Sequence, residues 1–242
     1  MFIDVITRKE DIMPEKVKNH IIVVFDVFLA TTTIATALEA GALKVYTTAT
    51  PDQGQKLSKE IGSDQCYLAG EKKGKVIDGF QSPWPLSIRN KVRDKNLILC
   101  STNGTVAIDR WRQGKHIYTS SLINNASVAY YVANRHREEE KFTLVCAGSN
   151  GHFSLEDFVG VGSFINYYLK RSNRKIRLSD SAKASYHLFL SQEENIFSFL
   201  QTSAVGRQLI KGGLMNDLVY ASTQDISHII PTYKDSSFQG LF

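Results

Sequence analysis

The sequence predicts an α/β protein with a three-layer α/β/α architecture, a mainly parallel or mixed sheet and a helical C-terminal region. Short apolar runs alternate with amphipathic segments up to about residue 170, and the first run, residues 21–27, is almost entirely apolar. Such a run suits a strand that is buried on both faces, and strands that alternate with helices favour a parallel sheet. From about residue 179 the pattern becomes helical.

The expected elements follow one another in a regular order along the chain. Strands are expected at residues 21–27, 43–47, 66–69, 97–100, 117–119 and 141–147. Helices are expected at residues 30–39, 51–61, about 105–112, 122–137 and 155–170. Gly41 marks the end of the first helix, and Ser154 is the expected N-cap of the last one.

The C-terminal quarter of the chain has a different character. Helices are expected at residues 179–190, 193–200 and 203–210, followed by an apolar stretch at 218–221. The residues after Pro231 are polar, and we expect them to fray. No linker rich in proline, glycine or serine and no repeat is visible, so we expect one domain over residues 1–242, with the helical tail packed on the sheet.

The composition excludes several classes of protein. The chain has 242 residues, of which 43% are hydrophobic and 22% charged, which is ordinary for a soluble globular protein. It has no apolar run of about 18 residues, and its start lacks the pattern of a signal peptide. Its three cysteines, Cys66, Cys100 and Cys146, form no CxxC motif. This argues against a disulfide framework or a thiolate zinc site and favours a cytoplasmic location.

The net charge of +5 raises the question of a nucleic-acid partner. The basic residues are scattered and interrupted by acidic ones, as where the segment 135–137 is followed by Glu138, Glu139 and Glu140. No nucleic-acid-binding module is visible, so solvated charged faces are the favoured interpretation. We expect no nucleic-acid or membrane partner.

Ligands of open α/β sheets bind beyond the carboxyl ends of the strands, and four strand ends here have polar clusters. The first contains Asp26, Thr31, Thr32 and Thr33. A carboxylate within an apolar strand is costly to bury unless it is paired or binds a metal. The threonines can cap the following helix or bind an anion at its N-terminus, and the sequence leaves both interpretations open.

The second cluster is centred on Glu71, which follows a short strand and precedes two lysines. A carboxylate there could bind Mg²⁺ directly, and the alternative is a solvated hairpin tip. The third cluster contains Asn103, Gly104 and Thr105 between a strand and a helix. Its backbone N–H groups could bind an anion, although it is not a Walker motif, and a well-capped loop is the alternative.

The fourth cluster is the richest and lies between the strand at 141–147 and the helix at 155–170. Its glycines allow a ligand to approach the backbone closely. Glu156 and Asp157 lie in the first helical turn, where carboxylates favour the positive end of the helix dipole. Together with Asp26 and Glu71 they could complete a Mg²⁺ site made of oxygen ligands.

A thiol-based phosphatase is an alternative that the sequence favours less. Such enzymes contain a Cys-x5-Arg motif, in which the arginine holds the phosphate that the thiolate attacks. Cys100 is followed six positions later by Val106, and Cys146 by His152. Neither residue supplies a guanidinium group, and nothing in the sequence clearly lowers the pKa of either thiol.

Taken together, the four clusters resemble the 2-phosphosulfolactate phosphatase family, often called ComB-like. The matching stretches are VVFDVFLATTTIATALEAGA, GEKKGKVIDGF, CSTNGTVA and CAGSNGHFSLEDFVGVG, with a weaker match in DLVYASTQDISHIIPTY. They occur in the family's order and span roughly residues 20–232. Each motif alone is weak, but four motifs in order are specific.

The resemblance implies a cytoplasmic, Mg²⁺-dependent phosphatase that converts 2-phosphosulfolactate to 3-sulfolactate, with a small phosphorylated acid as its substrate. It implies catalytic and metal-binding roles for Asp26, Glu71, Glu156 and Asp157. It also implies substrate-binding roles for a larger set: Thr31, Thr32, Thr33, Lys72, Asn103, Gly104, Thr105, Gly148, Gly151, His152 and Ser154. A homo-oligomer is compatible with the sequence, which has no feature that sets its order.

The chain departs from the family pattern mainly at arginines. Leu29, Val106 and His152 stand where the pattern has arginine, and Lys72 replaces the arginine of a Gly-Glu-Arg motif. Arginine holds several oxyanions bidentately, which aliphatic side chains cannot do. Two alternatives therefore stay open: a phosphatase for a less anionic substrate, or a binding or regulatory protein on the same fold.

Overall fold

The computed structural model describes residues 1–101, 104–110, 114–136, 141–172 and 174–241. Its strands form one sheet in the order β5-β4-β6-β3-β11-β10-β7-β2-β8-β1-β9. The strand bounds are β1 Phe2–Ile6, β2 His20–Phe25, β3 Lys44–Thr48, β4 Cys66–Lys72, β5 Lys75–Val76, β6 Asn96–Cys100, β7 His116–Ser120, β8 Lys141–Cys146, β9 Arg177–Leu178, β10 Ile230–Lys234 and β11 Ser237–Leu241.

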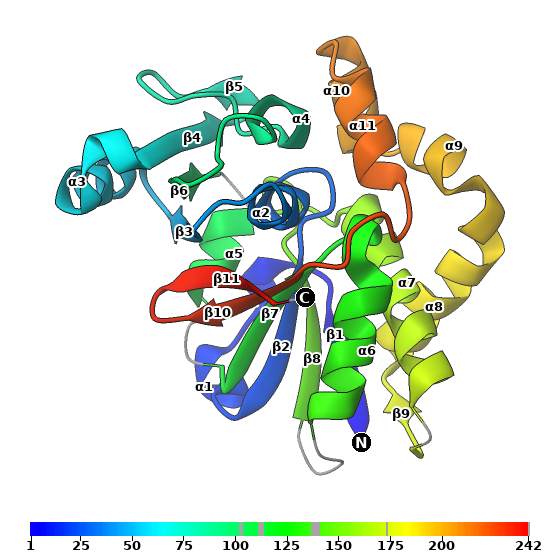
Figure 1. Ribbon diagram of the computed structural model, residues 1–242. Helices are drawn as coiled ribbons and strands as arrows, with labels where there is room; N and C mark the ends of the chain where they lie inside the picture. The colour runs from blue at the N-terminus through cyan, green and yellow to red at the C-terminus, as the bar shows by residue number, and fades with distance from the viewer. Residues whose placement is uncertain (102–103, 111–113, 137–140, 173, 242) are drawn as a thin grey trace.

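Helices precede, follow and cover these strands (Figure 1). The helix bounds are α1 Pro14–Val17, α2 Ala30–Glu39, α3 Pro51–Ile61, α4 Pro85–Ile88, α5 Gly104–Arg110, α6 Asn125–Arg135, α7 Leu155–Arg171, α8 Asp180–Gln192, α9 Ile196–Gln201, α10 Ala204–Lys211 and α11 Met215–Ser222. Short 3-10 turns occur at Lys9–Asp11, Ser63–Gln65, Leu122–Asn124 and Glu193–Asn195. The predicted α/β class with a mainly parallel, mixed sheet is confirmed. None of the helices described is long and apolar enough to cross a membrane.

The sheet consists of two parallel halves joined by an antiparallel hairpin. Strands β4, β6 and β3 form one half, and β7, β2, β8, β1 and β9 form the other. The hairpin β10–β11 lies between them and pairs with each half at a single position, Thr232 with Tyr118 and Phe238 with Val45. This limited pairing lets the halves run in different directions, as Figure 1 shows. The loops after β2, β4 and β8 can therefore face a common cavity.

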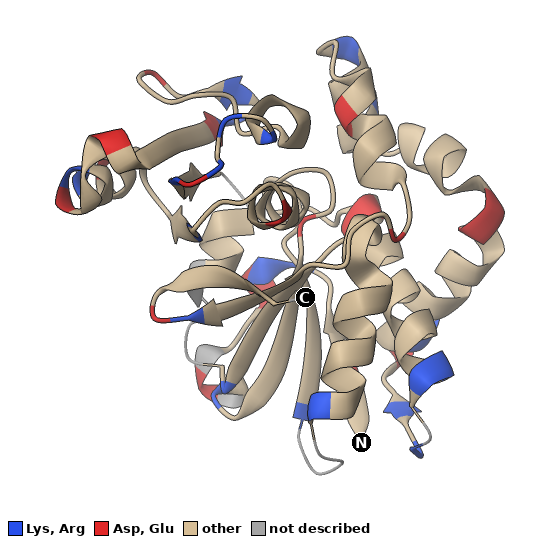
Figure 2. Ribbon diagram, viewed as in Figure 1, with Lys and Arg blue, Asp and Glu red and all other residues tan. Residues whose placement is uncertain are grey.

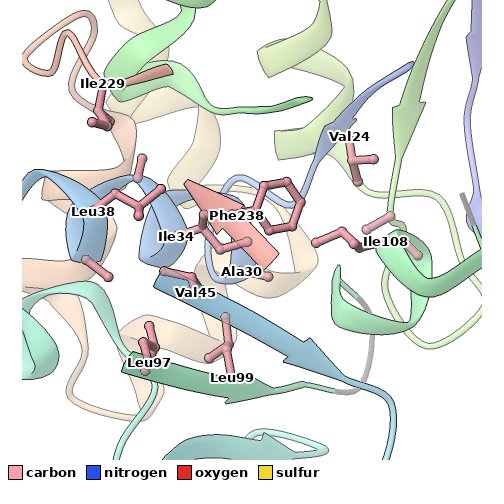
Figure 3. Close-up of a cluster of buried hydrophobic side chains, with 14 of the residues drawn as sticks. Val24, Ala30, Ile34, Leu38, Val45, Leu97, Leu99, Ile108, Ile229 and Phe238 are labelled. Carbon is pink, nitrogen blue, oxygen red and sulfur yellow. The ribbon is translucent and has the colours of Figure 1, made fainter. Parts of the chain in front are cut away.

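The hairpin corrects the expectation that the chain frays after Pro231. The turn residues Asp235 and Ser236 have φ values of 49° and 63°, which suit the two-residue turn that joins antiparallel strands. Phe238 is fully buried and packs in the core beside Ile34 of α2 and Val45 of β3 (Figure 3). One buried aromatic side chain and a tight turn thus order a segment whose composition is polar.

In the part of the chain that the structure describes, three clusters of buried apolar side chains hold the layers together. The first surrounds α2 and includes Val24 from one half of the sheet and Leu97 from the other (Figure 3). The second lies between the larger half of the sheet and the helices α6, α7 and α8. The third lies under the helical tail and joins Phe28, Leu209 and Leu218. The tail therefore packs against the same loops that follow the strands.

Helix caps and one close helix contact fix the start of this tail. Ser154 accepts a hydrogen bond from the Asp157 N–H, as expected for the N-cap of α7, and Ser179 caps α8 in the same way. A Cβ atom at Gly162 of α7 would lie 2.2 Å from the Ser185 carbonyl oxygen of α8. Glycine at this position therefore allows α8 to pack closely along α7.

Candidate active site

A cavity of about 490 Å³ lies between the β4–β5 hairpin, the loops after β2 and β8, and the helices α10 and α11. Its floor is acidic, because the four predicted carboxylates line it: Asp26, Glu71, Glu156 and Asp157. Figure 2 shows acidic segments at the ends of β2 and β4 and at the start of α7, whereas the basic residues are spread over many elements. These four groups lie in three separate parts of the chain, just after β2, in β4 and at the start of α7, and the fold brings them to one cavity.

Asp26 follows β2 directly and lies at the floor of the cavity. Burial raises the pKa of its carboxyl to about 7, with a further contribution from the negative charge of Glu71. A Cβ atom at Gly104 would lie 2.3 Å from Oδ2 of Asp26, so only glycine fits against this carboxyl group. The requirement for glycine at position 104 thus has a steric explanation that does not involve anion binding.

Glu71 occupies the last part of β4 and is 6% exposed. Its Oε2 atom accepts a 2.7 Å hydrogen bond from the backbone N–H of Gly74. Lys73 and Gly74 have positive φ values of 53° and 78°, which make the tight turn into β5. The hydrogen bond therefore links the carboxylate to the turn of the β4–β5 hairpin.

Asp157 joins two of the loops that surround the cavity. Its Oδ1 accepts a hydrogen bond from the Val27 N–H at 2.9 Å, and its Oδ2 accepts one from the Gly148 N–H at 3.1 Å. Burial raises the pKa of this carboxyl well above its usual value, and the charges of Asp26 and Glu156 raise it further. Both oxygens bind backbone donors, so Asp157 fixes the loops after β2 and β8 relative to each other.

Glu156 lies beside Asp157 in the first turn of α7 and is 4% exposed. Burial raises the pKa of its carboxyl, and hydrogen bonds with the side chains of Ser154 and Ser203 act in the opposite direction. Ser203 is the N-cap of α10. Glu156 therefore connects the acidic floor to the helical tail.

The three threonines after β2 line no part of the cavity. Thr31 donates its hydroxyl to the Asp26 carbonyl at 3.0 Å, Thr32 to the Val27 carbonyl at 2.6 Å and Thr33 to the Pro83 carbonyl at 2.8 Å. All three are fully buried. The hydroxyls thus bind backbone carbonyls, and α2 has no hydrogen bond to a capping side chain, so these contacts do not support the capping interpretation.

The other predicted binding residues lie in different parts of the structure. Gly148 and Ser154 line the cavity, whereas His152 lines a neighbouring cavity that shares Glu156 and Val205 with the first. Thr105 is buried and exchanges hydrogen bonds with Ser101.

Lys72 and Gly151 are not among the residues that line the main cavity, and Gly151 accepts a hydrogen bond from Arg8 instead. Asn103 lies outside the described residues. The lysines that line the cavity are the next two of the hairpin, Lys73 and Lys75.

Comparison with known proteins decides the family of the chain. A sequence model of the 2-phosphosulpholactate phosphatase family matches residues 6–236. A protein of Clostridium beijerinckii named probable 2-phosphosulfolactate phosphatase is 35% identical over 97% of this chain and 98% of its own length. The chain belongs to the 2-phosphosulfolactate phosphatase family. The predicted resemblance is confirmed.

Two further members of this family show the same extent of similarity. Proteins with the same name from Clostridium acetobutylicum and Caldanaerobacter subterraneus are 34% and 30% identical to the chain. The matches cover 96% and 97% of this chain and 97% and 96% of the relatives. The similarity thus extends over the acidic floor and over the helical tail.

One member of the cavity lining bears on the family's arginine pattern. Leu29, which is expected from the resemblance to stand where that pattern has arginine, lines the cavity, whereas Val106 does not. No arginine lines the cavity among the residues that the structure describes. The cations that line it are Lys73 and Lys75, which are exposed on the hairpin.

Sequence reasoning missed two features of the site. Lys9 is 5% exposed, and its Nζ donates to the Ala147 carbonyl at 3.3 Å, where its charge opposes the rise in the pKa of Asp26. An apolar wall also lines the cavity, formed by Phe28, Leu29, Trp84, Val205, Leu209 and Leu214. A lone lysine near the N-terminus and apolar residues of tail helices have no local signal that points to a site.

The buried cysteines bear on the thiol alternative. Burial raises the pKa of the Cys146 thiol well above its usual value and also raises the pKa of Cys100. A thiolate nucleophile requires the opposite shift. Neither cysteine lines the cavity, so the structure gives the thiol mechanism no support.

The floor also has the chemistry of a site for a hard cation. No three His, Cys, Asp or Glu side chains of the described residues already stand close enough together to enclose a metal ion. Mg²⁺ does not require such a cage, because it commonly binds one or two carboxylates together with water and substrate phosphate. A group of buried carboxyls with raised pKa values is a donor set that suits such an ion.

Proposed function

We propose that the chain is a Mg²⁺-dependent phosphatase that hydrolyses the phosphate monoester of a small acid in the cytoplasm. Membership of the family and the names of its relatives support 2-phosphosulfolactate as the substrate and 3-sulfolactate as the product. The single observation that carries the proposal is the convergence of Asp26, Glu71 and Glu156 on one cavity. These are the chemical groups that Mg²⁺-dependent phosphoryl transfer requires.

In this proposal one or two of the carboxylates of Asp26, Glu71 and Glu156 would bind the ion directly, and water and the substrate phosphate would supply its other ligands. Mg²⁺ would supply a positive charge that polarises a phosphoryl oxygen and offsets the negative charge of the ester. Asp157 is a positioning residue, since its two oxygens hold the backbone at Val27 and Gly148. The nearby loop of residues 148–150 and the exposed Lys73 and Lys75 would contact the anionic groups of the substrate.

A second candidate function is a phosphatase for a less anionic phosphate ester. The observation that favours it is the position of Leu29 at the cavity wall, where an arginine would meet a sulfonate or carboxylate. Both candidate functions require the same acidic floor. They differ only in the part of the substrate that the other walls of the cavity bind.

The test is release of inorganic phosphate from a panel of phosphate monoesters, with and without Mg²⁺. The proposal expects release that requires Mg²⁺ and that Asp26→Asn abolishes. Absence of release from every ester in the presence of Mg²⁺ would favour a binding or regulatory protein. Release that persists in a chelator would contradict the role of the metal.

A further inference from the structure

We infer that Gln208 of α10 is a specificity-determining residue, whose side-chain amide donates a hydrogen bond to the sulfonate of the substrate. The inference rests on the proposed phosphatase activity and adds one residue to it. It concerns how the helical tail recognises the part of the substrate that lies furthest from the phosphate.

Gln208 interrupts the apolar wall of the cavity. One side of α10 and its C-terminal end faces the cavity at positions i, i+3, i+4 and i+7, which are Val205, Gln208, Leu209 and Gly212. Among the described lining residues that the tail contributes, Gln208 alone has a polar side chain. Its side chain is exposed and has no hydrogen-bond partner within the described parts of the chain. The amide is therefore available to a group bound in the cavity.

Gln208 also lies where two cavities adjoin. A neighbouring cavity of about 420 Å³ has part of its lining in common with the main cavity. The shared residues are Ser149, Asn150, Ser154, Glu156, Val205 and Gln208. All of them except Val205 have polar side chains, so this boundary offers hydrogen-bonding groups beyond the acidic floor.

Both sides of this boundary are held in place. On one side, the backbones of Ser149 and His152 exchange two hydrogen bonds of 2.9 Å, which close the turn after β8. On the other side, Ser203 caps α10 by accepting a hydrogen bond from the Gly206 N–H at 2.9 Å. Leu209 is 4% exposed and anchors the same helix in the third hydrophobic cluster. The backbone that positions the Gln208 amide is thus fixed before a substrate binds.

The cations of the cavity lie closer to the floor. Oε2 of Glu71 accepts a hydrogen bond from the Gly74 N–H, so the hairpin turn that contains Lys73 and Lys75 lies against the floor. In 2-phosphosulfolactate the carboxylate is attached to the carbon that bears the phosphate, whereas the sulfonate is one carbon further away. The two lysines therefore suit the phosphate and the carboxylate, and the sulfonate extends toward the tail.

A neutral donor at position 208 has a physical reason. A cation there would be attracted to Glu156, a candidate metal ligand that lines the same two cavities. An amide N–H donates to an anion without pairing with that carboxylate, and a hydrogen bond to a charged group is stronger than one between neutral groups. Gln208 can thus bind the sulfonate and leave the acidic floor to the metal.

Two esters that share one skeleton provide the test: 2-phospho-3-sulfolactate and 2-phospholactate, which lacks the sulfonate. We measure kcat/KM for phosphate release by the full chain with Mg²⁺. The variant is Gln208→Met, which keeps the length and helix propensity of the side chain and removes its donor.

The wild type should prefer the sulfo ester. In Gln208→Met the ratio of the two kcat/KM values should fall about tenfold, which corresponds to about 1.4 kcal/mol. An unchanged ratio, or a preference of the wild type for 2-phospholactate, would overturn the inference and leave the proposed phosphatase intact.

A matched variant locates the effect. Gln55→Met makes the same change on α3, at an exposed position that does not line the main cavity. It should leave both kcat/KM values unchanged. Equal shifts of the ratio in Gln208→Met and Gln55→Met would show that the preference does not arise at α10.

Failure of the proposed function gives a different result. If neither ester is hydrolysed with Mg²⁺, the phosphatase activity is wrong, and calorimetric titration of both esters into the wild type and Gln208→Met then tests the amide alone. A tenfold fall in affinity for the sulfo ester relative to 2-phospholactate would still support the role of Gln208. An unchanged ratio of affinities, or no binding of the sulfo ester to the wild type, would overturn it.

Discussion

The floor and the wall of the cavity are built in different ways. The floor consists of carboxylates at the ends of β2 and β4 and in the first turn of α7, and backbone N–H groups fix two of them, Asp157 and Glu71. The wall consists of apolar side chains, half of them from the helical tail, and packing fixes them. Burial, together with the like charges gathered in the floor, raises the pKa of Asp26, which costs stability, whereas the wall adds buried area.

This difference indicates that turnover and substrate choice are separable in this molecule. Changes to the floor should remove activity toward every ester, and some of them should stabilise the fold. Changes to the wall should shift the choice between esters.

Asp26→Asn should lower kcat/KM by at least about a hundredfold, more than is typical for loss of an outer-shell group around a metal. It should not lower stability, because a neutral amide of the same shape replaces a carboxyl whose ionisation is costly at this position. Phosphate release measures the expected loss of kcat/KM, and urea unfolding measures the stability. Retention of activity, or a clear loss of stability, would contradict the account of the floor.

Asp157→Asn should instead destabilise the protein. The amide offers one acceptor oxygen where two backbone N–H groups, of Val27 and Gly148, need an acceptor. One buried donor is left without a partner, which costs roughly 1–3 kcal/mol in the free energy of unfolding. Urea unfolding of Asp157→Asn and Asp26→Asn, done in parallel, measures the difference in their free energies of unfolding. Equal stability of the two variants would show that Asp157 does not join these loops.

Leu29→Arg should place a positive charge in the apolar wall of the cavity. We expect kcat/KM for 2-phosphosulfolactate to rise about tenfold, since a charge-assisted hydrogen bond contributes roughly 1.5–3 kcal/mol before the cost of placing the larger side chain. Val106→Arg should have a smaller effect, because Val106 does not line the cavity. Steady-state kinetics of both variants test this, and a larger effect of Val106→Arg would contradict the assignment of the wall.

The smallest effect concerns a carboxyl of the tail, Asp217. Burial raises its pKa above the ordinary value of 3.8, so the folded state holds the proton more tightly than the unfolded state. The resulting penalty is absent at low pH, grows as the pH rises above about 3.8 and is complete above the raised pKa.

Asp217→Asn keeps an acceptor for the Leu86 N–H and removes this penalty. The variant should therefore be more stable than the wild type at pH 7, and the difference should shrink as the pH approaches 4. Thermal unfolding at several pH values measures it. A difference that grows toward low pH would have the wrong sign for this explanation.

The floor was accessible from the sequence because its residues interrupt patterns. Asp26 ends an apolar run, and Glu71 and Glu156 follow others, so the ends of parallel strands predict their position. The division of the sheet into two halves could not be predicted from the sequence, since the hairpin that joins the halves has a polar composition. Only Ile230 and Phe238 of that hairpin are buried and strongly apolar.

The wall could not be read from the sequence for a related reason. Val205 and Leu209 have the spacing of any amphipathic helix that packs on a core, and nothing local shows that the core opens into a cavity. The threonines after β2 were ambiguous because a helix cap and an anion site use the same residues at the same position. In the structure their hydroxyls donate to backbone carbonyls instead, and α2 has no side-chain cap.

The most direct test of the central claim is calorimetric titration of Mg²⁺ into the wild type and into Asp26→Asn, in the absence of substrate. The account predicts saturable binding to the wild type, a matching rise in its melting temperature and loss of both in the variant. Absence of binding to the wild type, or equal binding to both proteins, would contradict the assignment of the acidic floor as the metal site.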